Sequence, residues 1–181
     1  MINRGTAATI VIIMLVLGAV AAFTLSTTKN SSESEAARTL KATADTSYTD
    51  LEGNPVTFDQ YKDKVRIVNA WASWCPFCVQ ELPDFEELAI EFSSDEVVVI
   101  AINRKESKEQ AARFLKSISS TDHIQMILDP GDAFYTSIGG FSMPETVFYD
   151  KEGNVSTHKR GFMSLDEMRT LVQKALDETN E

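Results

Sequence analysis

Two cysteines are the residues of this sequence best suited to chemistry. Cys75 and Cys78 are the only cysteines in the chain, and only Pro76 and Phe77 separate them. A run rich in β-branched residues, 65–71, precedes the pair and an amphipathic pattern follows it, so we expect a strand that delivers Cys75 to the first turn of a helix. A helix N-terminus lowers the pKa of a thiol, and proline suits a first helical turn because it has no N–H. The pattern predicts a reactive dithiol.

Three other interpretations of the cysteine pair are weaker. A structural disulfide stabilises a fold more when it closes a long loop, and this loop is very short. A structural zinc site usually has four ligands, and the other candidate ligands, His123 and His158, lie far along the sequence and are unpaired. Inert core cysteines fit poorly with the neighbouring Trp74 and prolines. Redox chemistry through a Cys-x-x-Cys motif is therefore the favoured interpretation.

Strands and helices are expected to alternate after residue 46. Strands are predicted around Tyr48 and over 56–58, 65–71, 97–102, 124–128, 147–149 and 155–158. Helices are predicted after the cysteines, along the apolar stripe 111–118, over 132–138 and from residue 164 onward. Pro83 lies inside the first helix and predicts a kink. Strands that alternate with helices pair in parallel, and a closing hairpin adds antiparallel strands. We therefore expect an α/β fold with a mixed central sheet and helices on both faces.

Polar residues mark where three of these helices should begin. Ser107 with Gln110, and Ser164 with Glu167, have the spacing of capping boxes, in which each side chain caps the other residue's backbone N–H. Asp132 is the expected cap of the short helix that ends near residue 138.

The first 25 residues have the composition of a membrane anchor or a secretory signal. Residues 7–25 carry no charge, and their length is within the range of a membrane-spanning helix. Residues 19–21, Ala-Val-Ala, fit a signal cleavage site, but the apolar stretch continues past them, which favours an uncleaved transmembrane helix. Residues 26–46 are rich in Ser, Thr, Ala and Glu and are predicted to form a flexible linker before a domain at 47–181. This order predicts a domain outside the cytoplasm.

The overall charge limits the partners of this protein. A formal net charge of −10 argues against nucleic acid, whose phosphates require a surface rich in lysine and arginine. The acidic residues are spread along the chain, which is typical of a solvated surface. A dithiol exchanges electrons through its own sulfur atoms, and we expect neither a cofactor nor a bound metal.

The residues around the cysteines resemble a known family. The stretch Trp71-Ala72-Ser73-Trp74-Cys75-Pro76-Phe77-Cys78, followed by Glu81-Leu82-Pro83, resembles the thioredoxin superfamily. Within it, the chain is most similar to the TlpA/ResA-like membrane-anchored thiol–disulfide oxidoreductases, which include proteins of cytochrome c maturation. The resemblance covers about 48–176 and extends to Met143-Pro144-Glu145-Thr146. It implies a thioredoxin-like fold.

The resemblance also implies roles for individual residues. Cys75 would be the nucleophile and Cys78 the resolving thiol. Related thioredoxins carry a buried aspartate where this chain has Asn69, an amide that cannot titrate. Glu81, one turn beyond Cys78, matches a glutamate that is proposed to tune the cysteines and to transfer protons. The alternative is an ordinary solvated glutamate in an early helical turn.

Four residues are expected to face the substrate. Pro144 matches the family's cis-proline, whose loop faces the cysteines and holds the substrate chain, and Met143 precedes it. Trp74 and Pro76 flank Cys75 and complete this expected binding surface. The alternative for Pro144 is a trans proline in a surface turn.

The sequence and its family resemblance thus predict a thiol–disulfide oxidoreductase that acts on disulfide-containing proteins outside the cytoplasm. The motif does not fix the direction of electron flow, but the resemblance favours a reductant supplied by a membrane electron donor. Apocytochrome c is one client that the resemblance implies, and secreted disulfide proteins in general are another. The alternatives are a soft-metal (copper) chaperone, whose relatives have a wider cysteine spacing and a nearby histidine, and a thiol peroxidase, whose Pro-x-x-x-Thr-x-x-Cys context is absent.

Overall fold

The computed structural model describes residues 48–92, 95–118 and 121–178. The expected anchor at 1–25 and the expected linker at 26–46 lie outside the described residues. Within the described ranges, no helix combines the length and the apolar character needed to cross a membrane.

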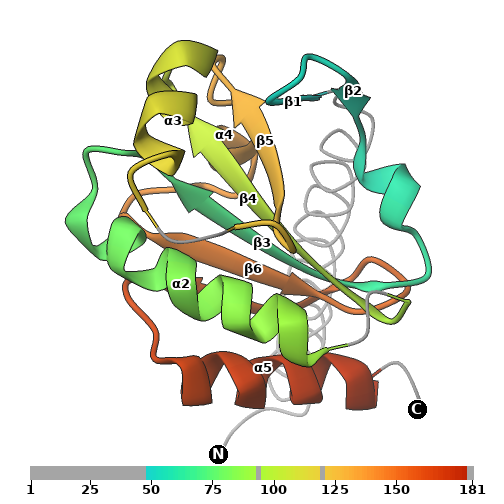
Figure 1. The fold of residues 1–181 in the computed structure, drawn as a ribbon. Helices are drawn as coiled ribbons and strands as arrows, with labels where there is room; N and C mark the ends of the chain where they lie inside the picture. Colours follow the sequence, from blue (N-terminus) through green and yellow to red (C-terminus); the bar gives the residue numbers. More distant parts are fainter. Residues whose placement is uncertain (1–47, 93–94, 119–120, 179–181) are drawn as a thin grey trace, which may run out of the picture. The chain divides into compact units, whose positions relative to one another are not determined.

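A seven-stranded mixed sheet forms the centre of the described domain (Figure 1). Its strands follow the order β2-β1-β5-β4-β3-β6-β7. Central strands β3, β4 and β5 are parallel, whereas β1, β2, β6 and β7 join by antiparallel pairing. The strand bounds are β1 Tyr48–Asp50, β2 Pro55–Val56, β3 Val65–Trp71, β4 Val97–Arg104, β5 Gln125–Asp129, β6 Glu145–Tyr149 and β7 Val155–Arg160.

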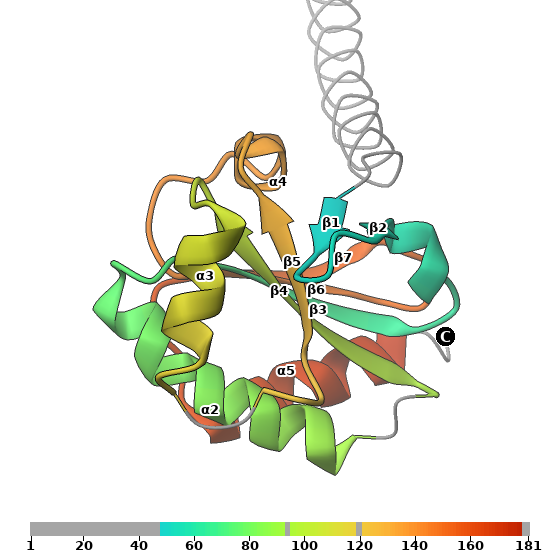
Figure 2. The ribbon, with the colours of Figure 1, turned by 45° about the horizontal axis from the view of Figure 1, so that its top comes forward.

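Helices cover both faces of this sheet, as the sequence predicted. The helical segments are η1 Phe58–Tyr61, α2 Pro76–Glu91, α3 Lys108–Leu115, α4 Ala133–Ser137 and α5 Leu165–Glu178. Helix α2 connects β3 to β4, and α3 connects β4 to β5, so both connections move in the same direction along the sheet. Because such crossovers are right-handed, both helices lie on one face. Helix α5 lies beside α2 on that face, and α4 lies on the opposite one (Figure 2).

The apolar core places the cysteines at its edge. On the α2 face, Trp71, Leu82 and Phe85 belong to one buried cluster that also contains both cysteines. On the opposite face, the Phe134 ring packs edge-on against Phe58, at a centroid distance of 5.9 Å. The two core layers fix β3 and α2, the elements that carry the dithiol.

Several predicted strand ends differ from the structure, and at two of them polar or packing contacts outweighed the apolar pattern. Strand β2 stops at Val56, and Phe58 instead begins η1, where its ring packs against Tyr48 and Phe134. Strand β4 continues past the apolar run to Asn103 and Arg104. These polar residues remain buried because carboxylates accept their side-chain hydrogen bonds.

The predicted caps at Ser107 and Ser164 form only in part. Each serine hydroxyl accepts the expected backbone N–H, from Gln110 and Glu167 respectively, at 3.3 Å. Neither reciprocal bond forms, because the Gln110 side chain donates to a buried carboxylate and the Glu167 carboxylate accepts from Lys159.

Asp132 is the N-cap residue of α4, as predicted, but its side chain makes no capping hydrogen bond. Its carboxylate instead binds Arg104, with Nε donating to Oδ1 at 2.7 Å. The carboxylate of Asp129 caps α4 and accepts the backbone N–H groups of Ala133 and Phe134 at 3.0 and 2.8 Å. Pro83 lies within α2, which continues through it.

Candidate active site

The two cysteines lie where β3 ends and α2 begins. Cys75 is the N-cap residue of α2, Pro76 is in the first turn, and a disulfide joins Cys75 to Cys78. The backbone N–H of Cys78 donates to Sγ of Cys75 at 3.2 Å. An N–H aimed at this sulfur, at the positive end of a helix dipole, stabilises negative charge on it after reduction.

The cysteines differ in their access to solvent. The surface of Cys75 is 4% exposed, whereas Cys78 is fully buried in the core cluster. An incoming sulfur atom therefore reaches Cys75 first. A nucleophilic cysteine must be reached by the client sulfur, whereas a resolving cysteine needs to reach only the first cysteine. The difference in exposure fits these two roles.

Glu81 is buried, so the expectation of an ordinary solvated glutamate is excluded. It lies three residues beyond Cys78 in α2, and its Oε1 accepts the backbone N–H of Met163. Its Oε2 has no hydrogen-bond partner among the described residues. Burial raises the pKa of Glu81 to about 8, against the opposing effect of the Met163 hydrogen bond. The carboxyl is consequently mostly protonated at neutral pH.

Asn69 occupies a buried position in β3 and donates from Nδ2 to Oγ1 of Thr146 at 3.0 Å. The side chain cannot titrate, so it is not the counterpart of a buried aspartate. Of the two positions considered in the sequence, only Glu81 supplies a buried titratable group.

The loop before β6 carries the expected cis-proline. The Met143–Pro144 peptide bond is cis, which excludes the trans alternative. Because Ala70 of β3 pairs with Glu145 of β6, Pro144 lies beside the end of β3 that leads to Cys75. Met143 packs against the core cluster that contains the cysteines. The structure therefore brings this loop to the dithiol.

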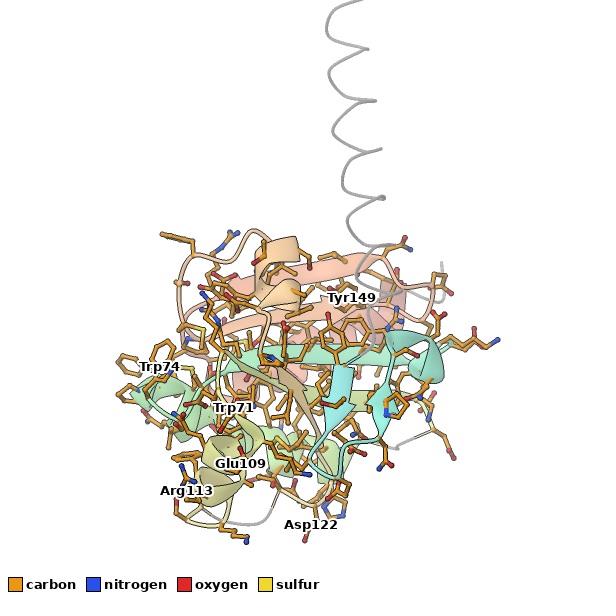
Figure 3. The ribbon with its side chains drawn as sticks, turned by 90° about the horizontal axis from the view of Figure 1, so that it is seen from above. Trp71, Trp74, Glu109, Arg113, Asp122 and Tyr149 are labelled. Carbon is orange, nitrogen blue, oxygen red and sulfur yellow. A yellow bond between two sulfur atoms is a disulfide. The ribbon has the colours of Figure 1, made fainter. Side chains whose placement is uncertain are left out.

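The two remaining predicted residues lie at the surface next to Cys75. Trp74 and Pro76 are both exposed. Figure 3 shows Trp74 projecting outward at the edge of the domain, whereas Trp71 lies further inside. Both predicted positions are thus open to a client chain.

A role for Glu106 was not predicted from the sequence. Its side chain binds the loop before Cys75. This carboxylate is buried and accepts the backbone N–H of Ser73 at 2.9 Å as well as its hydroxyl. It also accepts from the side-chain amides of Asn103 and Gln110, both at 2.6 Å. Its position just after β4 was the available signal, since site residues gather at the carboxyl ends of parallel strands.

The role of Glu145 was not predicted from the sequence either. Its side chain binds the backbone of the cis-proline loop. Its buried carboxylate accepts the backbone N–H groups of Phe141 and Ser142, both at 2.8 Å. It also contacts Nε2 of His158 at 2.8 Å, and Arg160 lies 3.6 Å away. Burial opposes ionisation, but the two backbone N–H groups and His158 together lower the pKa of Glu145.

Fold and site together define a thioredoxin-like protein with a redox-active dithiol: the Cys-x-x-Cys pair opens a helix, and a cis-proline loop lies beside it. The model of the Redoxin family matches residues 33–174, and the chain belongs to this family.

Similar proteins carry related names. The thiol-disulfide oxidoreductase ResA of Bacillus cereus is 27% identical over 164 residues, which cover 91% of this chain and 93% of the relative. The thiol:disulfide interchange protein HelX of Rhodobacter capsulatus is 30% identical over 124 residues, 68% of this chain and 65% of the relative. Among solved structures, the exposed lipoprotein thioredoxin Etrx1 of Streptococcus pneumoniae has a TM-score of 0.64 and 29% identity, over 72% of this chain and 99% of that one. This chain is a thiol–disulfide oxidoreductase.

Proposed function

We propose that this protein reduces disulfide bonds of client proteins outside the cytoplasm, with Cys75 as the nucleophile and Cys78 as the resolving thiol. The observation that carries the proposal is the position of Cys75. It is the helix N-cap, its sulfur accepts the Cys78 N–H, and it is the more accessible of the two cysteines.

The reaction exchanges one disulfide for another. In the reduced enzyme, the Cys75 thiolate attacks one sulfur of the client disulfide, an S–S bond forms between them, and the other client sulfur leaves as a thiolate that takes up a proton. The Cys78 thiol then loses its proton and attacks Sγ of Cys75, which expels the second client thiolate. Two electrons pass to the client, and the enzyme ends as the Cys75–Cys78 disulfide that the structure contains.

Glu81 is proposed to move the proton of Cys78. The two residues are three apart on one helix and therefore face the same side. Burial raises the pKa of this carboxyl to about 8, which makes its carboxylate basic enough to take a proton from a thiol. A solvated glutamate, with a pKa about four units below that of a thiol, would be a much weaker base.

The client chain is proposed to lie against four residues around the disulfide. Trp74 and Pro76 are exposed on one side of Cys75, and Met143 and Pro144 are on the loop beside it. A client segment that runs along this loop would bring its sulfur to Cys75. Proteins with surface-accessible disulfides fit this arrangement, and the family resemblance makes apocytochrome c one such client.

The N-terminal segments are proposed to hold the domain at the membrane. Residues 1–25 would form a transmembrane anchor and residues 26–46 a flexible linker to the domain at 47–181. Each catalytic cycle oxidises the dithiol, so a membrane electron donor must reduce it again. A tethered domain would meet this donor and its clients near the same surface.

The midpoint potential of the purified full chain tests the proposed direction. We would equilibrate it with dithiothreitol or glutathione redox buffers and follow tryptophan fluorescence, with Cys75→Ser as the control that cannot form the disulfide. A value near or below about −230 mV is expected for a reductant. A value near about −120 mV, typical of a strong oxidant, would reverse the direction, and the absence of a reversible disulfide would refute the redox function altogether.

A further inference from the structure

Four exposed aromatic side chains come from the segments that carry the active-site groups. Their exposed fractions are 57% for Trp74, 58% for Phe77, 81% for Phe141 and 39% for Phe162. Trp74 and Phe77 flank Cys75 in sequence, and Phe141 precedes the cis-proline loop. Exposed aromatic residues gathered around one site are typical of a binding surface.

Phe77 and Phe162 form a pair across two elements. Phe77 lies in the first turn of α2 and Phe162 between β7 and α5, and their ring centroids are 6.3 Å apart with an interplanar angle of 52°. Both rings remain open to solvent in spite of this contact. Two touching, exposed rings make a continuous apolar shelf beside the dithiol.

The backbone on both sides of Phe162 is tied to the active site. The N–H of Gly161 donates to the carbonyl oxygen of Pro144 at 2.9 Å, and the N–H of Met163 donates to Glu81. Gly161 has φ +85°, a conformation that costs glycine little. The backbone on both sides of Phe162 is therefore fixed before a client arrives, which lowers the entropic cost of ordering this segment on binding.

Phe141 lies three residues before the cis-proline and is 81% exposed. Its backbone N–H donates to the buried Glu145, and its ring lies 5.9 Å from the guanidinium carbon of Arg160. Arg160 ends β7 and is followed by the Phe162 loop. The loops that carry Phe141 and Phe162 are thus joined by two contacts: Arg160 with the Phe141 ring, and the Gly161 N–H with the Pro144 carbonyl oxygen.

We propose that these four side chains, Trp74, Phe77, Phe141 and Phe162, form an aromatic clamp that selects client cysteines flanked by an aromatic or large aliphatic residue. The inference rests on the proposed function and names its substrate class. A mixed disulfide must bring the client sulfur to Cys75, so the neighbouring client residues must pass over these rings. Aromatic and aliphatic side chains pack well against such rings. A lipid surface is disfavoured as the occupant, because the net charge of −10 repels anionic lipids.

Two matched peptides test the clamp. Both carry one cysteine as a mixed disulfide with glutathione; phenylalanine flanks the cysteine in one peptide and serine in the other. Reduced full chain should reduce the phenylalanine peptide about tenfold more efficiently in kcat/KM, mainly through a lower KM. The variants Phe77→Ser and Phe162→Ser should each cut this preference to about threefold, and the double variant should remove it. Ile90→Ser, which changes an equally exposed apolar residue near the other end of α2, should keep the full preference.

The outcomes separate the clamp from the proposed function. Equal efficiencies for the two peptides in the wild type would overturn the clamp, whether or not the variants fold. Failure to reduce either peptide or oxidised glutathione would overturn the proposed function itself. In the full chain reconstituted into vesicles, quenching of Trp74 fluorescence by brominated lipid would identify lipid as the occupant and refute the clamp. A dimer that the double variant dissociates would identify a second copy instead and refute it equally.

Discussion

The proton-bearing residue of this site lies on a helix and not on the sheet. In β3, Asn69 is buried but binds Thr146 as an amide, whereas Glu81 of α2 is buried with one oxygen bonded to the Met163 backbone. The residue that we propose moves the proton therefore follows the dithiol on its own helix.

Glu81→Gln should change the pH dependence of thiol reactivity. In the wild type, burial raises the Glu81 pKa to about 8, and in the reduced protein the titration of this carboxyl should influence that of the nearby thiols. The amide cannot titrate, so the variant should show a simpler curve with a slower resolving step at neutral pH. Alkylation rates of the reduced full chain from pH 5 to 10 measure this effect. Glu87→Gln, at an exposed position on the same helix, is the control, and superimposable curves for Glu81→Gln and wild type would contradict the role of Glu81.

The same glutamate should make the oxidised protein less stable as the pH rises. Its pKa is about 8 in the folded state and about 4.3 when unfolded, so between these values the folded state holds a proton that the unfolded state lacks. The stabilising contribution is complete below about pH 4.3 and is lost as the pH rises through 8. Relative to Glu81→Gln, the wild type should lose up to about 1.4 kcal/mol per pH unit in this window. Urea unfolding from pH 5 to 8 measures the difference, and a constant difference would exclude this linkage.

At the scale of elements, apolar periodicity was sufficient to predict the mixed sheet, its helices and the junction that carries the dithiol. Periodicity failed where polar contacts determine the end of a strand. Asn103 and Arg104 extend β4 because buried carboxylates bind their side chains. The long-range contacts that support the site could not be predicted for a different reason. Glu106 bonds to Ser73, 33 residues away, and Glu81 bonds to a backbone group 82 residues away. A local pattern contains no information about such contacts.

Glu106→Ala should loosen the junction between β3 and α2. The substitution leaves the Ser73 N–H and two side-chain amides without their acceptor, and each such loss costs on the order of 1–3 kcal/mol when the group stays buried. We expect a lower free energy of unfolding and slower reduction of disulfides, since the Ser73 loop positions Cys75. Chemical denaturation and reduction rates of glutathione disulfide measure the two effects.

The control for this prediction is Glu109→Ala, because Glu109 is an exposed residue of the neighbouring helix α3. If Glu106→Ala lowers stability but leaves the rate equal to that of the control, Glu106 supports the fold and does not position the cysteine.

At the scale of the whole molecule, the chemistry needs a reducing supply that the domain does not contain. The described residues contain one dithiol, at the edge of the apolar core, and each client reduction in the proposed reaction leaves it oxidised. The proposed anchor at 1–25 and the proposed linker at 26–46 would keep such a domain beside a membrane-bound donor. Anchoring and turnover are therefore linked in this proposal.

The anchor can be tested on the full chain expressed in bacteria. An uncleaved anchor predicts a membrane-bound protein whose intact mass includes residues 1–21, and whose reduced Cys75 reacts with a membrane-impermeant maleimide in intact spheroplasts. A chain released as a soluble protein that starts at Ala22 would show instead that the segment is a cleaved signal, since cleavage is expected after the Ala-Val-Ala site. Labelling only after lysis would contradict the location outside the cytoplasm. The variant Cys75→Ser is the control for the labelled residue. Because its remaining cysteine, Cys78, is buried, labelling of this variant should fall sharply.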